Sequence, residues 1–346
     1  CDWSSLRFAY DHNYTQSGVE RWRCKLMWKT ILRRVLLMIP QVIILSVLIF
    51  LLAQAMPGDP FTGLINPNQD PAVIEQMRQA AGLNDPWYVQ YFRWIGNALQ
   101  GDFGQSFLYK RSVADLIGER IINTLYLSIL TVVLTYLIAV PLGMLAGRYQ
   151  NSILDKIVVI YNFFSFAVPL FIFGLIMLFV FGYRLGWFPT SGSQTLGLQG
   201  GFITQWIDRL KYILLPSITQ AFLATAVTIQ YLRSEVIDSK SLDFVRTARS
   251  KGVPTNKVFS RHIFRNAALP MASQMGYEIT SLIAGSVVIE KIFGYPGVGK
   301  LFIDSIGQRD YTVITSLVLI LGIATLVGTL LSDIIMSIVD PRIRIQ

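Results

Sequence analysis

Long apolar stretches separated by shorter polar segments dominate the hydrophobic pattern of the chain. Each stretch is close to the roughly 20 residues that a helix needs to cross a bilayer, and none alternates apolar and polar residues as a barrel strand would. The predicted spans are Val35–Ala55, Ile121–Gly147, Ile157–Gly182, Tyr212–Leu232, Pro270–Glu290 and Val313–Val339. The expected fold class is therefore all-α, a polytopic membrane protein with six transmembrane helices.

These spans divide the chain into an ordered set of segments. An even number of spans places both ends of the chain on the same side of the membrane. The expected order is a cytoplasmic N-terminal tail (1–34), a first transmembrane helix (35–55), an extracytoplasmic segment (56–118), a transmembrane core (119–340) and a short cytoplasmic tail (341–346).

Composition and charge support this topology. Hydrophobic residues make up 53% of the chain and charged residues 15%, which excludes an ordinary soluble domain. Most Lys and Arg residues fall in the segments that are inside when the N-terminus is cytoplasmic, as expected for a cell-membrane protein with both termini in the cytoplasm. The net charge of +9 then reflects topology and contact with anionic membrane lipid. Since no basic face is interleaved with aromatic residues, nucleic-acid binding is not expected.

The most charged connection lies between the fourth and fifth spans. A short helix, Phe244–Lys251, is predicted there with Asp243 as its N-cap. Gly252 provides a left-handed stop. A second, amphipathic helix, Thr255–Leu269, is expected to begin with Thr255 as its cap and to lead into the next span. Such a sequence indicates a docking element rather than a catalytic one.

The order Arg246-Thr247-Ala248-x-x-x-Gly252, followed by a basic amphipathic run ending at Leu269-Pro270, resembles the "EAA" loop of ABC importer permeases. Arg246 and Thr247 stand where the general pattern has Glu and Ala. The spacing from Gly252 to Pro270 is longer than the general one, and both departures are similar to the dipeptide/oligopeptide branch. The alternative is an ordinary basic cytoplasmic loop obeying the positive-inside rule.

The resemblance implies that residues 233–269 form a cytoplasmic coupling loop that sits in a groove of an ATPase subunit. The small side chain of Ala248 is expected to let the short helix sit close in that groove. Closure of the ATPases would push on the short helix, and the amphipathic helix would pass the movement to the fourth and fifth spans. The expected coupling residues are Asp243, Phe244, Arg246, Thr247, Ala248, Gly252 and Arg261.

Further motifs resemble the same family along roughly Lys29–Arg344. They include Pro57-Gly58-Asp59-Pro60 after the first span and the aromatic segment around Asp85–Leu99, which suits a helix in the membrane interface. A Leu-Gly-Trp-Phe-Pro run follows the third span, and Asp340-Pro341-Arg342 ends the last one. Together they imply the type I permease fold of ABC importers.

The loop after the fifth span contains a misleading motif. Residues 294–300 match the phosphate-binding pattern except that Leu301 replaces the Ser or Thr that would bind magnesium. Because the motif follows a membrane span on the outer side, ATP binding is not expected. The stretch resembles the outer loop of the permease family, which re-enters near the pathway and can meet the binding protein. The residues that carry this resemblance are Gly294, Pro296, Gly297, Gly299 and Asp304.

Polar residues inside the predicted spans are candidates for the translocation pathway. They are Asn123, Thr225, Thr228, Tyr277 and Glu278. An unpaired carboxylate such as Glu278 is costly in a bilayer and is expected to face a cavity, a partner or a proton. Interhelical hydrogen bonding is the alternative explanation for all five residues.

The resemblance implies a permease subunit that is not an enzyme and binds no cofactor. ATP and Mg belong on two partner ATPase subunits. The other implied partners are a second homologous permease subunit and an extracytoplasmic substrate-binding protein that delivers a peptide. Nickel chelates and glutathione are alternative cargoes, although nothing in the sequence resembles a metal site. An ion-coupled secondary transporter is the rival class, but only Glu278 and Asp333 offer charges within plausible spans.

Overall fold

The computed structural model describes residues 12–55, 84–106, 108–268 and 286–339. Its regular elements within these ranges are helices, and the only strand-like pairing there is an isolated bridge between Gln105 and Ser112. The elements are α1 (His12–Ala55), α3 (Trp87–Leu99), α4 (Val113–Arg148), α5 (Ile153–Ala167), α6 (Leu170–Met177), the π-helix η1 (Leu178–Arg184), α7 (Phe202–Ser239), α8 (Asp243–Ser250), α9 (Thr255–Lys257), the π-helix η2 (Val258–Ile263), α10 (Phe264–Ala267), α12 (Val287–Ile292), α13 (Val298–Gln308) and α14 (Tyr311–Val339).

Four of the described helices are long and apolar enough to cross a membrane, and the number is five if one pair of helices bent by 100° counts as a single span. The four segments are Ile31–Ala55, Val113–Arg148, Phe202–Ser239 and Tyr311–Ile334. They confirm the first, second, fourth and sixth predicted spans. The fifth predicted span falls largely on residues 269–285, which lie outside the described residues, so the count of six stays a prediction.

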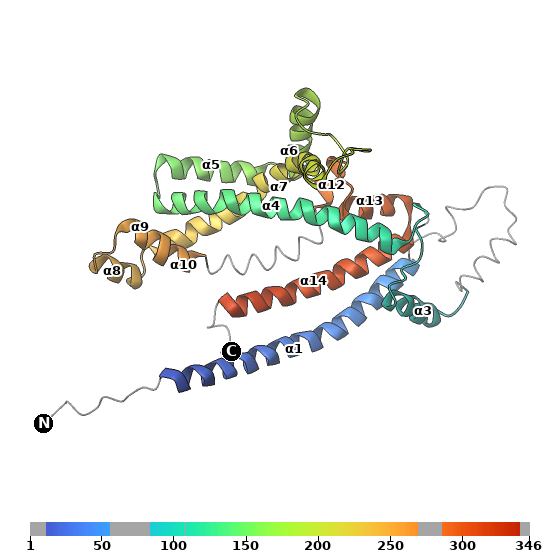
Figure 1. Cartoon of the computed structure of the whole chain (residues 1–346), viewed down its shortest axis with the longest axis horizontal. Helices are drawn as coiled ribbons and strands as arrows, with labels where there is room; N and C mark the ends of the chain where they lie inside the picture. The colour runs from blue at the N-terminus through green and yellow to red at the C-terminus, as the bar shows by residue number, and fades with distance from the viewer. Residues whose placement is uncertain (1–11, 56–83, 107, 269–285, 340–346) are drawn as a thin grey trace.

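The third predicted span is not one helix. The chain turns by 100° between α5 and the segment Leu170–Arg184, as the separate directions of α5 and α6 show (Figure 1). Pro169 disfavours helical geometry at the preceding residue, and Val168 has φ −89° and ψ 118°. The proline therefore ends α5, and the segment predicted as a single span, Ile157–Gly182, is divided between two helical segments.

The helices α4 and α7 form the centre of the fold and run in the same direction (Figure 1). Small residues of α4 let the two backbones approach closely. A Cβ at Gly143 would lie 3.0 Å from the Cβ of Leu232, and one at Gly147 would lie 2.7 Å from the Cβ of Val236. Gly143 thus meets Leu232, and Gly147, four residues on, meets Val236, four residues on. The C-terminal end of α7 therefore lies against that of α4.

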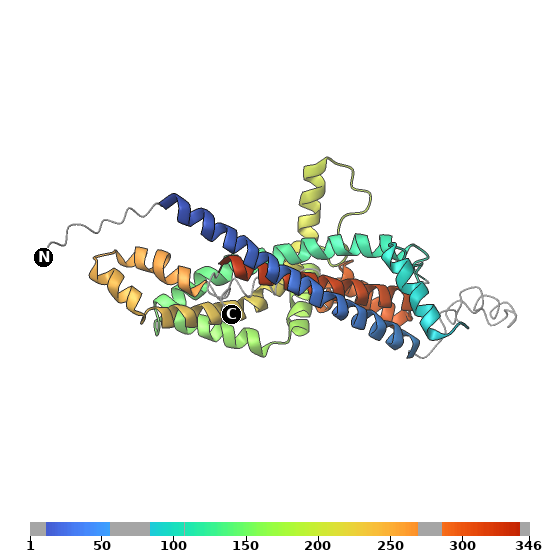
Figure 2. The same cartoon turned by 90° about the horizontal axis from the view of Figure 1, so that it is seen from below.

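The helices α1 and α14 lie side by side along one flank and cross at an angle (Figures 1 and 2). Arg34 and Asp333 form an ion pair between them, with 3.2 Å from Nε to Oδ2. At the far end of α1, Ser46 shares a 2.8 Å hydrogen bond with the hydroxyl of Tyr91 in α3. The helix α3 confirms the predicted aromatic helix, and its Trp87 and Phe92 are exposed.

The two ends of the molecule carry different elements. We call the end that carries α8–α10 (residues 243–267) the coupling end, and the end that carries α3 and α13 the loop end (Figure 1). The C-terminal ends of α4 and α7 and the start of α5 lie at the coupling end. Each end contains one of the two motifs for which the sequence predicts a function.

Candidate functional site

The helix α8 forms where the sequence predicts it, but its N-terminus is one residue earlier. Leu242 is the N-cap, with φ −73° and ψ 150°, and its side chain makes no capping hydrogen bond. Asp243 is therefore the first helical residue rather than the cap. Its exposed carboxylate lies in the first turn, where negative charge is favoured by the helix dipole.

The stop after α8 is formed as predicted. Gly252 has φ +73°, a left-handed conformation that costs a residue with a Cβ about 1–2 kcal/mol. Its N–H donates to the carbonyl of Arg249 at 2.9 Å, and the N–H of Val253 donates to the carbonyl of Ala248 at 3.2 Å. This pair of hydrogen bonds is the Schellman motif, which satisfies carbonyls that the helix end leaves open.

The buried side of α8 faces the chain's own core. Val245 and Ala248 pack with Leu232 and Val236 of α7, and Ala248 is only 6% exposed. The expectation that Ala248 fits a partner's groove is therefore wrong for this structure, because its methyl group already has intramolecular neighbours. The exposed side of α8 consists of Asp243, Arg246, Thr247, Arg249 and Ser250.

The second helix of the coupling loop is not one continuous α-helix. In place of one α-helix over Thr255–Leu269, a π-helical stretch separates α9 from α10, and the described helix ends at Ala267. The N-cap is Pro254, so Thr255 is the first helical residue and not the cap. A π-helix brings residues five positions apart onto one side, and Val258 and Ile263 are both fully buried.

The apolar side of this second helix agrees with the sequence-based expectation. Its buried residues join α7 and α8 in one cluster, whereas Arg261 is exposed. The members of this coupling-end cluster are Leu232, Val236, Val245, Ala248, Val258, Phe259, Ile263 and Ala267. A force applied to α8 would therefore reach α7 and the second helix through direct side-chain packing.

The candidate pathway residues in the described part of the chain have structural contacts. Asn123 donates from Nδ2 to the carbonyl of Pro296 at 2.9 Å. Thr225 is fully buried, shares a hydrogen bond with the hydroxyl of Tyr161 and donates to the carbonyl of Phe222 at 2.8 Å. Thr228, three residues on, is also buried. These contacts favour interhelical packing, the alternative that the sequence left open.

The other two pathway candidates, Tyr277 and Glu278, lie outside the described residues. Asp333, the remaining charge within a predicted span, is paired with Arg34 at 3.2 Å.

Several hydrogen bonds at the loop end converge on Glu290. This role of Glu290 was not predicted from the sequence. Glu290 in α12 is fully buried. One of its carboxylate oxygens accepts from the hydroxyl of Thr124 at 2.8 Å, and the other accepts from the N–H of Lys300 at 3.0 Å. Thr124 in turn accepts from the N–H of Val298 at 2.8 Å. The glycine-rich loop, residues 290–310, is thus fastened to the N-terminal third of α4.

The glycines of this loop lie at positions where neighbouring atoms leave no room for a side chain or where φ is positive. Gly294 has φ +55°. A Cβ at Gly297 would overlap the carboxylate of Glu290, and one at Gly299 would lie 2.6 Å from the Cα of Val287. The loop therefore packs closely around Glu290 and Val287. Backbone N–H groups that would hold a phosphate in a nucleotide-binding loop here face an internal carboxylate.

Two further contacts fix the ends of the glycine-rich loop. Asp304 in α13 forms an ion pair with Lys291 in α12. Asp310, which is nearly fully buried, accepts from the hydroxyl of Ser106 at 2.6 Å and from the N–H of Leu108 at 3.1 Å. The loop therefore contacts the segment before α4 as well as α4 itself.

Comparison with known proteins shows what these features belong to. Residues 139–345 match the family described as "Binding-protein-dependent transport system inner membrane component", and residues 27–128 match the N-terminal family of the same transport systems. The chain belongs to this family. It is the membrane-embedded permease of a binding-protein-dependent transport system, as its coupling loop and glycine-rich loop had indicated.

Two relatives of this permease align over nearly their full length. The oligopeptide transport system permease protein AppB of Bacillus subtilis (strain 168) is 42% identical over 315 residues, which cover 91% of this chain and 98% of the relative. The glutathione transport system permease protein GsiC of Escherichia coli (strain K12) is 35% identical over 318 residues, covering 92% and 99%. A solved structure of the MetNI methionine ABC transporter aligns with a TM-score of 0.49 at 15% identity, over 65% of this permease and 96% of that chain.

Proposed function

We propose that this permease is one subunit of an ATP-driven importer. Together with a second homologous permease it forms the pathway for peptides that an extracytoplasmic binding protein delivers. Two separate ATPase subunits bind ATP and Mg and supply the energy, while this chain binds no nucleotide and catalyses no reaction. Both of its termini lie in the cytoplasm, so that α8 faces the ATPases and the glycine-rich loop faces the binding protein.

The exposed charged side of α8 is the observation that carries this proposal. The helix lies at the tip of the coupling end (Figure 1). Its inner side is anchored through Val245 and Ala248, and its outer side presents Asp243, Arg246 and Thr247 to the surroundings. A short helix with one anchored and one free side can receive a partner and transmit its movement.

The coupling-end cluster offers a route for that movement. Val245 of α8 belongs to the same cluster as Leu232 and Val236 of α7. Displacement of α8 would therefore press directly on the last turns of α7. The close contact at Gly147 would then engage α4. We propose that ATP-driven closure uses this route to change the side to which the cargo path opens.

The proposed cargo class is the peptide. The relatives AppB and GsiC are named for oligopeptide and glutathione transport. Glutathione is itself a tripeptide, so both names fit a path that accommodates peptide bonds. A nickel chelate and an ion-coupled mechanism remain the competing outcomes of the test below.

The test is reconstitution of the complex that co-purifies with the tagged permease. We expect ATPase subunits and a second permease to co-purify. Proteoliposomes with the binding protein outside and ATP inside should accumulate radiolabelled trialanine, and a non-hydrolysable ATP analogue should abolish accumulation. Uptake driven by a proton or sodium gradient without ATP would refute the proposal. ATP-driven uptake of a nickel chelate, with no uptake of trialanine or glutathione, would overturn the peptide assignment.

A further inference from the structure

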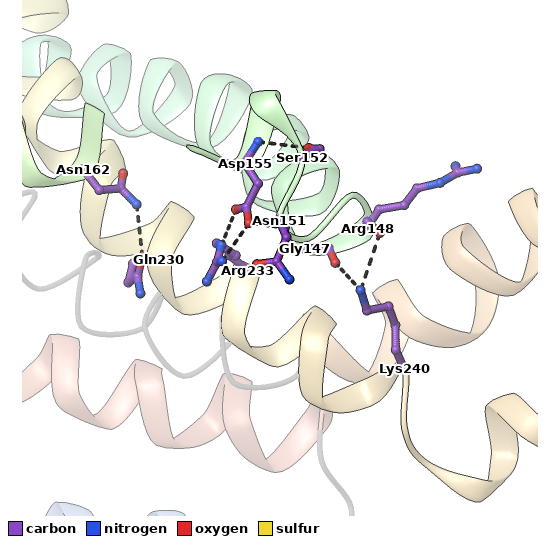
Figure 3. Close-up of polar contacts among 9 residues, drawn as sticks. All are labelled: Gly147, Arg148, Asn151, Ser152, Asp155, Asn162, Gln230, Arg233 and Lys240. Carbon is purple, nitrogen blue, oxygen red and sulfur yellow. Dashed lines mark hydrogen bonds and ion pairs between the residues drawn. The ribbon is translucent and has the colours of Figure 1, made fainter. Parts of the chain in front are cut away.

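The turn between α4 and α5 is fastened to α7 by a buried ion pair (Figure 3). The Nε and Nη2 atoms of Arg233 donate to the two carboxylate oxygens of Asp155 at 2.6 and 2.9 Å. The side chains are 4% exposed for Asp155 and 18% for Arg233. Two parallel charge-assisted hydrogen bonds fix orientation as well as distance. The pair therefore restricts sliding of α5 along α7.

The same carboxylate also shapes the turn. Asp155 accepts from the N–H of Asn151 at 2.8 Å, and Ser152 caps α5 by accepting from the N–H of Asp155 at 3.2 Å. Asn151 has φ +66°, so the turn includes a left-handed residue. One aspartate thus links the conformation of the turn to the position of Arg233.

A second cation, Lys240 at the C-cap of α7, holds the end of α4 that leads into the turn. Lys240 donates from Nζ to the carbonyls of Gly147, at 2.7 Å, and Arg148, at 3.5 Å (Figure 3). These carbonyls belong to the last turn of α4, which has no helical partner for them. Burial lowers the pKa of Lys240, while the nearby Asp155 carboxylate acts in the opposite direction. Lys240 is three residues before the start of α8.

Arg148, the last residue of α4 before the turn, also contacts the second helix of the coupling loop. Arg148 donates from Nη2 to the side-chain oxygen of Asn256 at 2.8 Å, and its guanidinium lies 4.9 Å from the ring centre of Phe259. Phe259 is part of the coupling-end cluster. The end of α4 that leads into the α4–α5 turn is therefore bonded to both flanks of α8, through Lys240 before it and through Asn256 after it.

We infer that Asp155, Arg233 and Lys240 are positioning residues for coupling, and that the α4–α5 turn is a second connection from α8 to the membrane helices. The inference rests on the proposed function. The first connection is the apolar contact of α8 with α7. The second would carry the same displacement to the start of α5, whose later residues contact α7 through the hydrogen bond from Asn162 to Gln230 at 3.2 Å and through the one between Tyr161 and Thr225. Without it, the start of α5 would lose its ion pair to the C-terminal part of α7.

The main test compares import and ATP hydrolysis in the complete reconstituted complex. The variants are Asp155→Asn, the conservative Asp155→Glu, and the exchange of Asp155→Arg with Arg233→Asp. A matched control is Glu119→Gln, which breaks an exposed ion pair with Arg111 at the start of α4. For Asp155→Asn we expect trialanine imported per ATP hydrolysed to fall about tenfold, within the usual range for coupling between sites, with ATP hydrolysis largely retained.

The conservative variant and the exchange should each recover much of the lost ratio, and Glu119→Gln should leave it unchanged. A merely structural role would lower complex yield without changing the ratio for the complexes that assemble. An unchanged ratio in Asp155→Asn would overturn the inference. If the unmodified complex imports nothing with ATP, the proposed function fails instead, and the two failures are therefore distinguishable.

A second measurement keeps all three positioning residues and so does not depend on the variants folding. Spin labels at Gln150, in the turn, and at Ser250, at the end of α8, both occupy exposed positions. In the assembled complex we expect their separation to stay constant when an ATP analogue closes the ATPases, because the turn moves with α8. A change in that separation equal to the movement of α8 against the loop end would refute the second connection.

Discussion

The carboxylate of Glu290 occupies the space that a side chain on Gly297 would need. Because Glu290 is held by Thr124 and by the N–H of Lys300, it cannot move aside without losing those hydrogen bonds. The glycine-rich loop therefore depends on one residue that lacks a side chain and on one whose side chain is fully buried. Their relationship joins α4, α12 and α13 in a single unit.

Substitution of Gly297→Ala should destabilise this unit. The added methyl would displace a carboxylate from its donors, and overpacking of this kind costs about 1–3 kcal/mol. We expect a lower midpoint of thermal unfolding for the purified complex in detergent. The matched control is Gly307→Ala in α13, where nothing lies within 4 Å of the added Cβ, and where removing a helical glycine should add about 0.5–1 kcal/mol. Equal midpoints for the two variants would contradict the assigned role of Gly297.

The close contact between α4 and α7 can be tested by comparing two glycine-to-alanine substitutions in α4. In Gly147→Ala the new Cβ would lie 2.7 Å from the Cβ of Val236 and 3.0 Å from the carbonyl of Arg233, so the helices must separate. We expect a loss of about 1–3 kcal/mol in stability. In Gly118→Ala, on the same helix, the Cβ has nothing within 4 Å, and no loss is expected. Thermal unfolding of both variants by circular dichroism measures the difference, and a tolerated Gly147→Ala would show that the helices do not need this close approach.

The stop after α8 should depend on backbone conformation rather than on space. A Cβ at Gly252 meets no atom within 4 Å, yet φ is +73°. Gly252→Val should cost about 1–2 kcal/mol and misdirect the following helix, with loss of uptake. Gly252→Asn should retain most uptake, because asparagine tolerates the left-handed region. Uptake of trialanine by reconstituted vesicles tests this, and equal activity of the two variants would be the opposing result.

The two sides of α8 should respond differently to a new charge. Ala248→Asp places a carboxylate in the coupling-end cluster, and a buried unpaired charge is strongly destabilising. We expect poor recovery of the permease itself. Thr247→Asp, on the exposed neighbouring position, should leave recovery unchanged but weaken co-purification of the ATPase. If Ala248→Asp is recovered as well as Thr247→Asp, the orientation of α8 in the structure is wrong.

The local features of the coupling loop could be predicted from sequence because their causes are local. Gly252 followed closely by Pro254 signals a helix stop whatever the surroundings. The inward side of α8 was not predictable in the same way, since Ala248 is buried by Leu232 and Val236 of another helix. The cap positions were wrong because Leu242 and Pro254 begin the helices through their backbone conformation alone, without a side-chain hydrogen bond.

Larger errors arose where tertiary contacts decide the outcome. Pro169 lies within the predicted third span, but a proline in a sequence does not say whether a helix bends or ends. Glu290 was treated as the end of a span because its partner Thr124 lies 166 positions away in the sequence. Only the spacing of Gly294, Gly297 and Gly299 gave a local sign that something must fit closely against this loop.

Orientation in the membrane is the next prediction. Single cysteines at Ser241 and Leu196 would occupy exposed positions beside α8 and before α7, in a background without Cys1 and Cys24. An impermeant maleimide added to intact cells should label the cysteine at Leu196 and spare the one at Ser241 until the membrane is permeabilised. The reverse pattern would place α8 outside and exclude contact with cytoplasmic ATPases.

Photocrosslinking from the exposed side of α8 tests the central claim most directly. A benzophenone amino acid at Arg246, in the assembled complex, should form an adduct with an ATPase subunit that mass spectrometry identifies, and the yield should change when ATP is added. The same group at Leu196 should give no such adduct. A complex that hydrolyses ATP and imports cargo, yet gives no ATPase adduct from position 246, would contradict the assignment of α8 as the coupling helix.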